Sequence, residues 1–288
     1  MEQQKLFKSE AGREQIMALY EQKLAGLNIV YDEIRVETSF GETHIIVSGD
    51  ANNPPLLLIH GSNGSAPIAL ETYPNLTEKY QVFAIDVLAQ PTKSAENRLS
   101  MKDLSYGEWI NEVLFLLDLR EVTLAGFSFG GLIILKTLLF DEQRIRASYI
   151  AAPAFIVNGN PIKALLKVFI PMKRYMRTLK RKHVEKFLAA LFTQRDEFAV
   201  QYLSRVFVHF KMDFTPVPVI REAEASQIKT PITLFAAGRD LMFPGRKMIR
   251  RARKIFPSLK KALLFPESRH VQNRADNTTI EQLILKQA

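Results

Sequence analysis

The chain has 288 residues, enough to bury a full core in one large α/β domain or in a core with an insertion. Its apolar fraction of 47% is ordinary for a globular protein, and no apolar run is long enough to span a bilayer. The absence of cysteine excludes disulfides, a thiol nucleophile and a thiolate metal site. The N-terminal residues are too charged for a signal peptide, so we expect a cytoplasmic protein.

The net charge of +9 is unevenly spread. Residues 161–186 carry nine Lys or Arg against the single acid Glu185, and a second basic run covers 246–254. Such runs can contact nucleic acid or an anionic membrane. Neither run has the interleaved aromatic residues of a single-strand binder, and no nucleic-acid-binding motif is present. Solvated helix faces are the simpler interpretation, and we expect no nucleic-acid partner.

The first basic run also contains apolar residues that could face a membrane. They are Leu165, Leu166, Phe169, Ile170 and Met172. Packing of these side chains onto the rest of the protein is the simpler interpretation, and we expect no membrane association.

Hydrophobic periodicity predicts strands and helices in alternation. An amphipathic helix over about 9–27 precedes an antiparallel hairpin made of 29–37 and 43–48. Further strands are expected at 56–59, 82–85, 122–125, 147–152, 231–237 and 261–265. Further helices are expected at 74–80, 105–119, 132–140 and 245–255, with a closing helix from near 279. This alternation predicts a mostly parallel sheet with helices on both faces.

Strand signals are scarce between about 154 and 228. Residues 161–192 and 195–211 are expected to form helices instead. A helical stretch of this length between two strands indicates a separate layer.

One stretch indicates chemistry. Residues 126–130, Gly-Phe-Ser-Phe-Gly, fit the G-x-S-x-G pattern, in which a serine projects from a sharp strand-to-helix turn. An ordinary turn with a capping serine is the alternative. The β-branched run before the motif and the apolar helix after it favour a nucleophile at Ser128.

A serine nucleophile needs a base and an acid that orients the base. His270 follows the last predicted strand in an irregular segment, where a loop side chain can reach a serine at the end of a central strand. Asp240 follows the strand at 231–237, and Asp86 follows an earlier strand. The order Ser128, Asp240, His270 is the triad order of α/β-hydrolases, which favours Asp240 over Asp86.

The tetrahedral intermediate of acyl transfer needs two N–H donors. Phe129, directly after the serine, is expected to supply one from its backbone. The second is expected from the loop after the strand at 56–59, where Ser62 is the best-placed residue and Asn63 the alternative.

These motifs resemble the α/β-hydrolase superfamily from about residue 43 to 287, and residues 37–49 resemble its bacterial carboxylesterase-like members. The match rests on His60-Gly61 after a buried strand, the Ser128 motif, Gly238-Arg-Asp240 with Pro244 following, and His270. The resemblance implies an eight-stranded sheet and a helical cap at 154–228, with the core formed by 1–153 and 229–288. It implies no metal and no organic cofactor.

Two positions depart from the family pattern. The segment after Asp86, Val-Leu-Ala-Gln-Pro-Thr-Lys-Ser94, lacks the usual glycines, which puts the shape of that loop in doubt. Arg269 stands where a glycine usually precedes the catalytic histidine, and its side chain could place a charge near the site.

The sequence therefore predicts a serine hydrolase acting on a small-molecule carboxylic ester through Ser128, His270 and Asp240, as a monomer or homodimer. Lactonase, thioesterase, C–C hydrolase, perhydrolase and aminopeptidase activities use the same triad and stay open. A binding protein that kept the fold without catalysis is the alternative from another class. The side chains of the cap, which decide the substrate, cannot be oriented from sequence.

Overall fold

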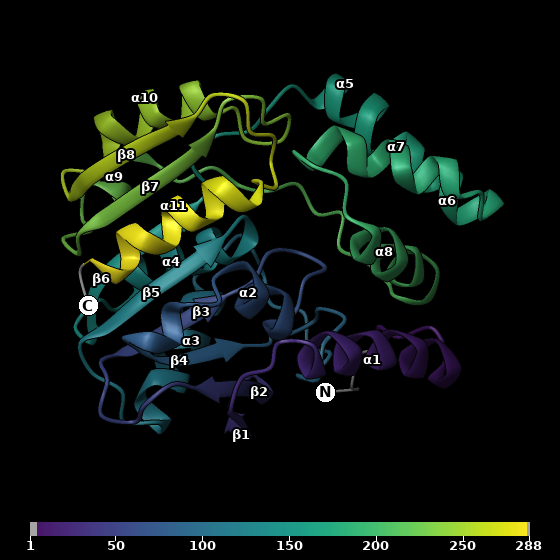
Figure 1. Ribbon diagram of the computed structural model, residues 1–288. Helices are drawn as coiled ribbons and strands as arrows, with labels where there is room; N and C mark the ends of the chain where they lie inside the picture. Colours follow the sequence, from purple (N-terminus) through teal and green to yellow (C-terminus); the bar gives the residue numbers. More distant parts are fainter. Residues whose placement is uncertain (1–4, 287–288) are drawn as a thin grey trace.

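The computed structural model describes residues 5–286 and contains an eight-stranded sheet (Figure 1). The strand order is β1-β2-β4-β3-β5-β6-β7-β8. β1 and β2 form the expected antiparallel hairpin at one edge, β2 is antiparallel to β4, and every later neighbouring pair is parallel. The strands are β1 (Tyr31–Thr38), β2 (Gly41–Ser48), β3 (Pro55–Ile59), β4 (Gln81–Ile85), β5 (Val122–Phe127), β6 (Ile145–Ala151), β7 (Ile232–Ala237) and β8 (Leu259–Phe265). The predicted mostly parallel sheet of eight strands is confirmed.

The helices connect these strands. They are α1 (Glu10–Ala25), α2 (Ala66–Thr72), α3 (Ser105–Leu116), α4 (Phe129–Phe140), α5 (Pro161–Ala164), α6 (Ile170–Thr178), α7 (Arg181–Leu191), α8 (Glu197–His209), α9 (Glu222–Ala225), α10 (Gly245–Ile255) and α11 (Arg274–Leu285). A 3₁₀ turn, η1, covers Leu76–Glu78, and a π-helical turn, η2, covers Leu165–Phe169.

Alternation along the central strands divides the core between the two faces of the sheet. Leu57 and Leu124 belong to a cluster that includes the apolar sides of α3, α4 and α10. Leu56 and Ala125 point the other way, into a cluster with α2 and α11. Both faces are therefore covered by helices, and the central strands β3 and β5 are buried.

Three predictions about helices were wrong. The helix expected over 74–80 is reduced to η1, while α2 lies just before it, at Ala66–Thr72, and was not predicted. The closing helix begins at Arg274, because the side chain of Asn273 accepts the N–H of Asp276 at 2.9 Å and so caps it. The long helix over 161–192 is broken at Leu179, which is left-handed with φ 54°, and α7 begins only at Arg181. Pro171, which lacks an N–H, follows the π-helical turn η2 but does not interrupt the helix.

The helices α5 to α8 lie apart from the sheet, and α8 lies above α1 (Figure 1). A third apolar cluster joins Ile16 and Leu19 of α1 to Phe187 of α7 and Phe207 of α8. The backbone strengthens this contact, because Lys8 N–H donates to the carbonyl of His209 at 2.8 Å. The N-terminal helix thus supports the helices that connect β6 to β7.

The apolar residues of the first basic run divide between two sides of η2 and α6. Met172 is buried, as the packing interpretation predicted, and Phe169 and Ile170 are half-buried. For Leu165 and Leu166 that interpretation was wrong, because 51% and 57% of their surfaces are exposed. Within residues 5–286, no helix has both the length and the apolarity that crossing a membrane requires.

Candidate active site

Ser128 lies between β5 and α4, in a backbone conformation that few non-glycine residues adopt. Its φ is 54° and its ψ is −108°. Its N–H donates to the carbonyl of Ala151 at 2.9 Å, and its own carbonyl accepts the N–H groups of Gly131 and Ala154 at 3.0 and 2.9 Å. These bonds offset the strain, which costs on the order of 1–3 kcal/mol. The turn points the serine hydroxyl away from both elements, as the motif predicted.

Two glycines allow this turn to approach its neighbours closely. A side chain at Gly130 would collide with the carbonyl oxygen of Ile59, at the end of β3. A Cβ at Gly126 would lie 2.8 Å from Cδ1 of Ile134 in α4. The spacing of the motif therefore fixes how the start of α4 packs against the sheet.

His270 lies in the loop between β8 and α11, with its ring between two phenylalanine rings. The ring centroids of Phe127 and Phe243 are 5.1 and 5.4 Å from that of the imidazole. The next residue, Val271, donates its N–H to the carbonyl of Leu191 at 2.9 Å, at the end of α7. The position of the histidine is thus set by β5, by the β7–α10 loop and by α7.

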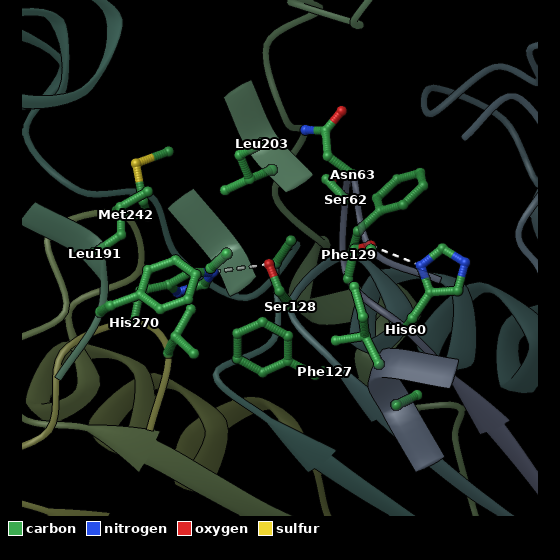
Figure 2. A pocket seen from close by; sticks show the side chains of 18 of the residues that line it. His60, Ser62, Asn63, Phe127, Ser128, Phe129, Leu191, Leu203, Met242 and His270 are labelled. Atoms are coloured by element: carbon green, nitrogen blue, oxygen red, sulfur yellow. Dashed lines mark hydrogen bonds between the residues drawn. The ribbon is translucent and has the colours of Figure 1, made fainter. Parts of the chain in front are cut away.

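The three predicted residues are brought together by hydrogen bonds. Ser128 Oγ lies 2.9 Å from His270 Nε2, and Asp240 Oδ2 lies 2.8 Å from His270 Nδ1 (Figure 2). The second oxygen of Asp240 accepts the N–H groups of Met242 and Phe243 at 2.7 and 3.0 Å. The arrangement fits an ionised Asp240 that accepts from Nδ1–H, which leaves Nε2 free to accept the serine proton.

Asp86 is engaged elsewhere. Its fully buried carboxylate accepts hydrogen bonds from the Tyr20 hydroxyl and from the Ala66 N–H, both at 2.9 Å, and lies 3.0 Å from Nδ1 of His44. Burial alone would raise the pKa of Asp86, but its partners, His44 first among them, hold that pKa below the usual range. This aspartate joins α1, β2 and α2 and does not orient His270.

His60 is structural as well. Its Nδ1 lies 2.7 Å from the carbonyl of Gly61, and Val87 N–H donates to its Nε2 at 3.0 Å. Both ring nitrogens are therefore occupied, and burial lowers the pKa of His60, so the ring is neutral. The ring links the loop after β3 to the loop after β4.

The candidate oxyanion donors lie on the side of Ser128 opposite His270 (Figure 2). Within residues 5–286, no acceptor takes the N–H of Ser62 or of Phe129. Asn63, in contrast, donates its N–H to Oε1 of Gln90 at 2.8 Å. The hydrogen bonding thus leaves Ser62 and Phe129 as the available pair and removes the alternative donor.

The serine opens onto a cavity of about 1150 Å³. Apolar side chains from α7 and α8 line it, including Leu191 and Leu203, and Met242 lies on the same side of Ser128 as His270 (Figure 2). Residues 5–286 offer no group of three or more His, Cys, Asp or Glu side chains that could hold a metal ion. The cavity therefore suits an apolar small molecule held near a serine hydroxyl.

The sequence pattern of the α/β hydrolase fold matches residues 54–206, which is more than half of the chain. The chain belongs to the α/β-hydrolase family. Two curated relatives come from Bacillus subtilis (strain 168). One, named uncharacterized carboxylesterase nap, is 33% identical over 122 residues, or 41% of this chain and 40% of the relative. The other, carboxylesterase YbfK, is 32% identical over 138 residues, or 47% of this chain and 46% of the relative. The aligned stretch thus spans less than half of each relative.

Solved structures match over a greater length. The crystal structure of naproxen esterase (carboxylesterase NP) from Bacillus subtilis has a TM-score of 0.83, covers 97% of this chain and 99% of its own, and is 20% identical. At this identity the likeness shows the fold, which agrees with the strand order of the sheet.

The contacts of two residues near this α/β-hydrolase site could not be predicted from the sequence. Gln90 was recognised only as part of an atypical loop, and no local pattern marks it as a partner of Asn63. Arg269 was recognised only as a residue that could add a charge near the site. Instead its guanidinium donates to the carbonyls of Ala189 and Phe192 at the end of α7. A cation at a helix C-terminus is favourable. The contact of Arg269 with α7 could therefore have been predicted only if the end of α7 had been known.

Proposed function

We propose that the protein is a serine hydrolase that cleaves carboxylic esters through an acyl-enzyme. The observation that carries the proposal is the unbroken hydrogen-bond chain from Ser128 through His270 to Asp240 on the wall of an apolar cavity. The names of the two curated relatives support an ester as the substrate. All three residues belong to one chain, so a monomer suffices for the chemistry.

In the first half-reaction, Ser128 Oγ forms a bond to the ester carbonyl carbon while its proton passes to Nε2 of His270. Asp240 stays ionised and stabilises the imidazolium. The carbonyl electron pair moves onto oxygen, where the N–H groups of Ser62 and Phe129 are available to donate. When the carbonyl re-forms, the C–O bond breaks and the alcohol leaves with the proton from His270.

In the second half-reaction, water replaces the alcohol. His270 takes a proton from the water as its oxygen bonds to the acyl carbon. The bond to Ser128 Oγ then breaks, the serine recovers its proton, and the carboxylic acid is released. No group outside the triad and the two backbone donors is needed to balance either step.

We also propose that residues 154–228 form a cap over the core of 1–153 and 229–288. The helices α7 and α8 supply Leu191 and Leu203 to the cavity, so this segment would select the acyl or alcohol group. A panel of p-nitrophenyl esters of increasing acyl length would measure that selection.

Covalent labelling by a fluorophosphonate tests the proposal directly. The native protein is expected to be labelled at a single site, and Ser128→Ala is expected to lose the label while unfolding at a similar temperature. Absence of labelling in the native protein would favour a binding protein that kept the fold.

A further inference from the structure

The segment of residues 161–178, which we call the cap ridge, has two apolar sides. Ala164, Val168 and Met172 are buried and line the cavity. On the other side, Ile162, Leu165 and Leu166 are 66%, 51% and 57% exposed, at helical spacing. A helix that is apolar on both sides is normally covered on both. An exposed apolar stripe of this kind marks an interaction surface.

The stretch that carries this stripe is also rich in positive charge. Of the nine Lys and Arg residues in 161–186, Arg181 alone makes an ion pair within the described part of the chain. Its partner at 2.9 Å, Glu185, is the only acid of the stretch, so no acid of the stretch is left to neutralise the other cations. Those cations are Lys163, Lys167, Lys173, Arg174, Arg177, Lys180, Lys182 and Lys186, all with exposed side chains. An anionic partner would therefore be attracted to the cap ridge.

We propose that the cap ridge docks the protein on an anionic lipid surface. Ile162, Leu165 and Leu166 enter the boundary between headgroups and acyl chains, and the neighbouring Lys and Arg side chains contact lipid phosphates. Apolar side chains flanked by cations are the composition of helices that lie in a membrane interface. The α5–α7 region is also well placed, because it stands at the outer side of the molecule, away from the sheet (Figure 1).

Charge and composition disfavour the other occupants. In a symmetric dimer the same patch would face itself, which would bring eight cations without an acid of the stretch against eight. A nucleic acid would satisfy the cations but would leave the exposed Leu165 and Leu166 in contact with phosphate and water. A lipid surface accommodates both kinds of side chain.

Docking in this way would bring the cavity to the lipid. Phe169, next to the stripe, lines the cavity and packs edge-to-face on Phe214, with ring centroids 6.2 Å apart. Phe214 also lines the cavity and is 50% exposed. An apolar route thus joins the exposed stripe to the cavity that holds Ser128. The docking itself does not depend on the proposed hydrolysis, and binding can be measured without it.

Vesicle co-sedimentation of the full chain tests the proposal. Binding is expected to vesicles of equal parts phosphatidylcholine and phosphatidylglycerol at low salt, to weaken as salt is added, and to be weak for phosphatidylcholine alone. Leu165→Ser with Leu166→Ser is expected to weaken binding by roughly tenfold per leucine. Thermal unfolding should stay near that of the native protein, because both side chains are exposed.

A matched pair of charge variants separates the cap ridge from net charge. Lys163→Gln, Lys167→Gln and Lys173→Gln together should weaken binding on the order of 100-fold, at about fivefold per charge. Arg246→Gln, Arg250→Gln and Arg253→Gln on α10 remove the same charge from exposed positions that form no ion pair with any residue of 5–286, and should have little effect.

Four outcomes would overturn the proposal. The first is that the native protein does not bind anionic vesicles at low salt. The second is that the two triple variants lose vesicle binding to the same extent. A dimer in light scattering that Leu165→Ser with Leu166→Ser abolishes, without vesicle binding, would assign the surface to a second copy. The last outcome is binding to homopolymeric RNA but not to anionic vesicles. If the triple lysine variant lost this RNA binding and the double leucine variant kept it, the surface would be assigned to nucleic acid.

Discussion

Gln90 accepts the backbone N–H of Asn63 on its side-chain oxygen, at 2.8 Å. This bond and the one from Val87 N–H to His60 join the loop after β3 to the loop after β4. The first of these loops carries Ser62, the proposed second oxyanion donor. A buried glutamine in the atypical loop thus holds the backbone segment that carries this proposed donor.

Gln90→Met tests this relationship, because it keeps the length of the side chain and removes the acceptor. We expect kcat for p-nitrophenyl acetate to fall on the order of 10- to 100-fold with little change in KM, since a displaced oxyanion donor weakens the transition state alone. Steady-state kinetics measure both constants.

Thr92→Val is the matched control in the same loop, because it removes only a long hydrogen bond, 3.4 Å, from Thr92 Oγ1 to the Val87 carbonyl. Its kcat should stay near the native value. A raised kcat in Gln90→Met would point to Asn63 as the donor, because the variant frees its N–H. An unchanged kcat would contradict a role of Gln90 in holding the oxyanion loop.

Substitution of Asp240 should lower activity, whereas substitution of Asp86 should lower stability. Asp240→Asn removes the carboxylate that accepts from Nδ1 of His270, and we expect kcat for p-nitrophenyl acetate to fall on the order of 10⁴-fold. Asp86→Asn should unfold at a lower temperature but keep a kcat within a small factor of native below that temperature. A large loss of kcat in Asp86→Asn with native activity in Asp240→Asn would reverse the assignment.

The sequence predicted the parts of the site that local patterns specify. The glycines around Ser128 and the strand before it form one short segment, and the positions of Asp240 and His270 follow from strand ends that hydrophobic runs reveal. The role of Asp86 could not be predicted in this way. Its partners, Tyr20, His44 and the N–H of Ala66, come from three distant segments, and a strand-end aspartate serves equally as a buried anchor or as a catalytic acid.

The helices of the cap show a second reason for failure. Leu179 adopts a left-handed conformation, which glycine or asparagine usually adopts. Because neither residue is present there, no local pattern in the sequence predicts the turn between α6 and α7. The direction of Arg269 depends on where α7 ends, and that end depends on packing. Such features are decided by tertiary contacts and not by local preference.

The buried carboxylate of Asp86 should make the free energy of unfolding depend on pH. Although burial alone would raise it, the pKa of Asp86 lies below its usual value because His44 and the N–H of Ala66 stabilise the charged form. A pKa lowered by folding gives stability that is complete above the unfolded value of about 3.9 and is lost as pH falls through the folded value. Between neutral pH and pH 3, the free energy of unfolding should therefore fall less steeply in Asp86→Asn than in the native protein. Urea unfolding at several pH values measures the two slopes, and parallel slopes would contradict this account.

Arg269 should stabilise the junction between the cap and the His270 loop. Its guanidinium donates to the carbonyls of Ala189 and Phe192, and a partly exposed cation at a helix C-terminus contributes about 0.3–1 kcal/mol. Arg269→Gln should therefore speed hydrogen exchange of the last turn of α7 and lower kcat/KM, because Val271 pairs with that end of the helix.

Arg239→Gln removes the same charge nearby, and its partner Glu267 is 75% exposed, so that ion pair contributes little. Exchange in α7 should be native in this control. Faster exchange in both variants would show that the charge near the loop matters rather than the contact that Arg269 makes with α7.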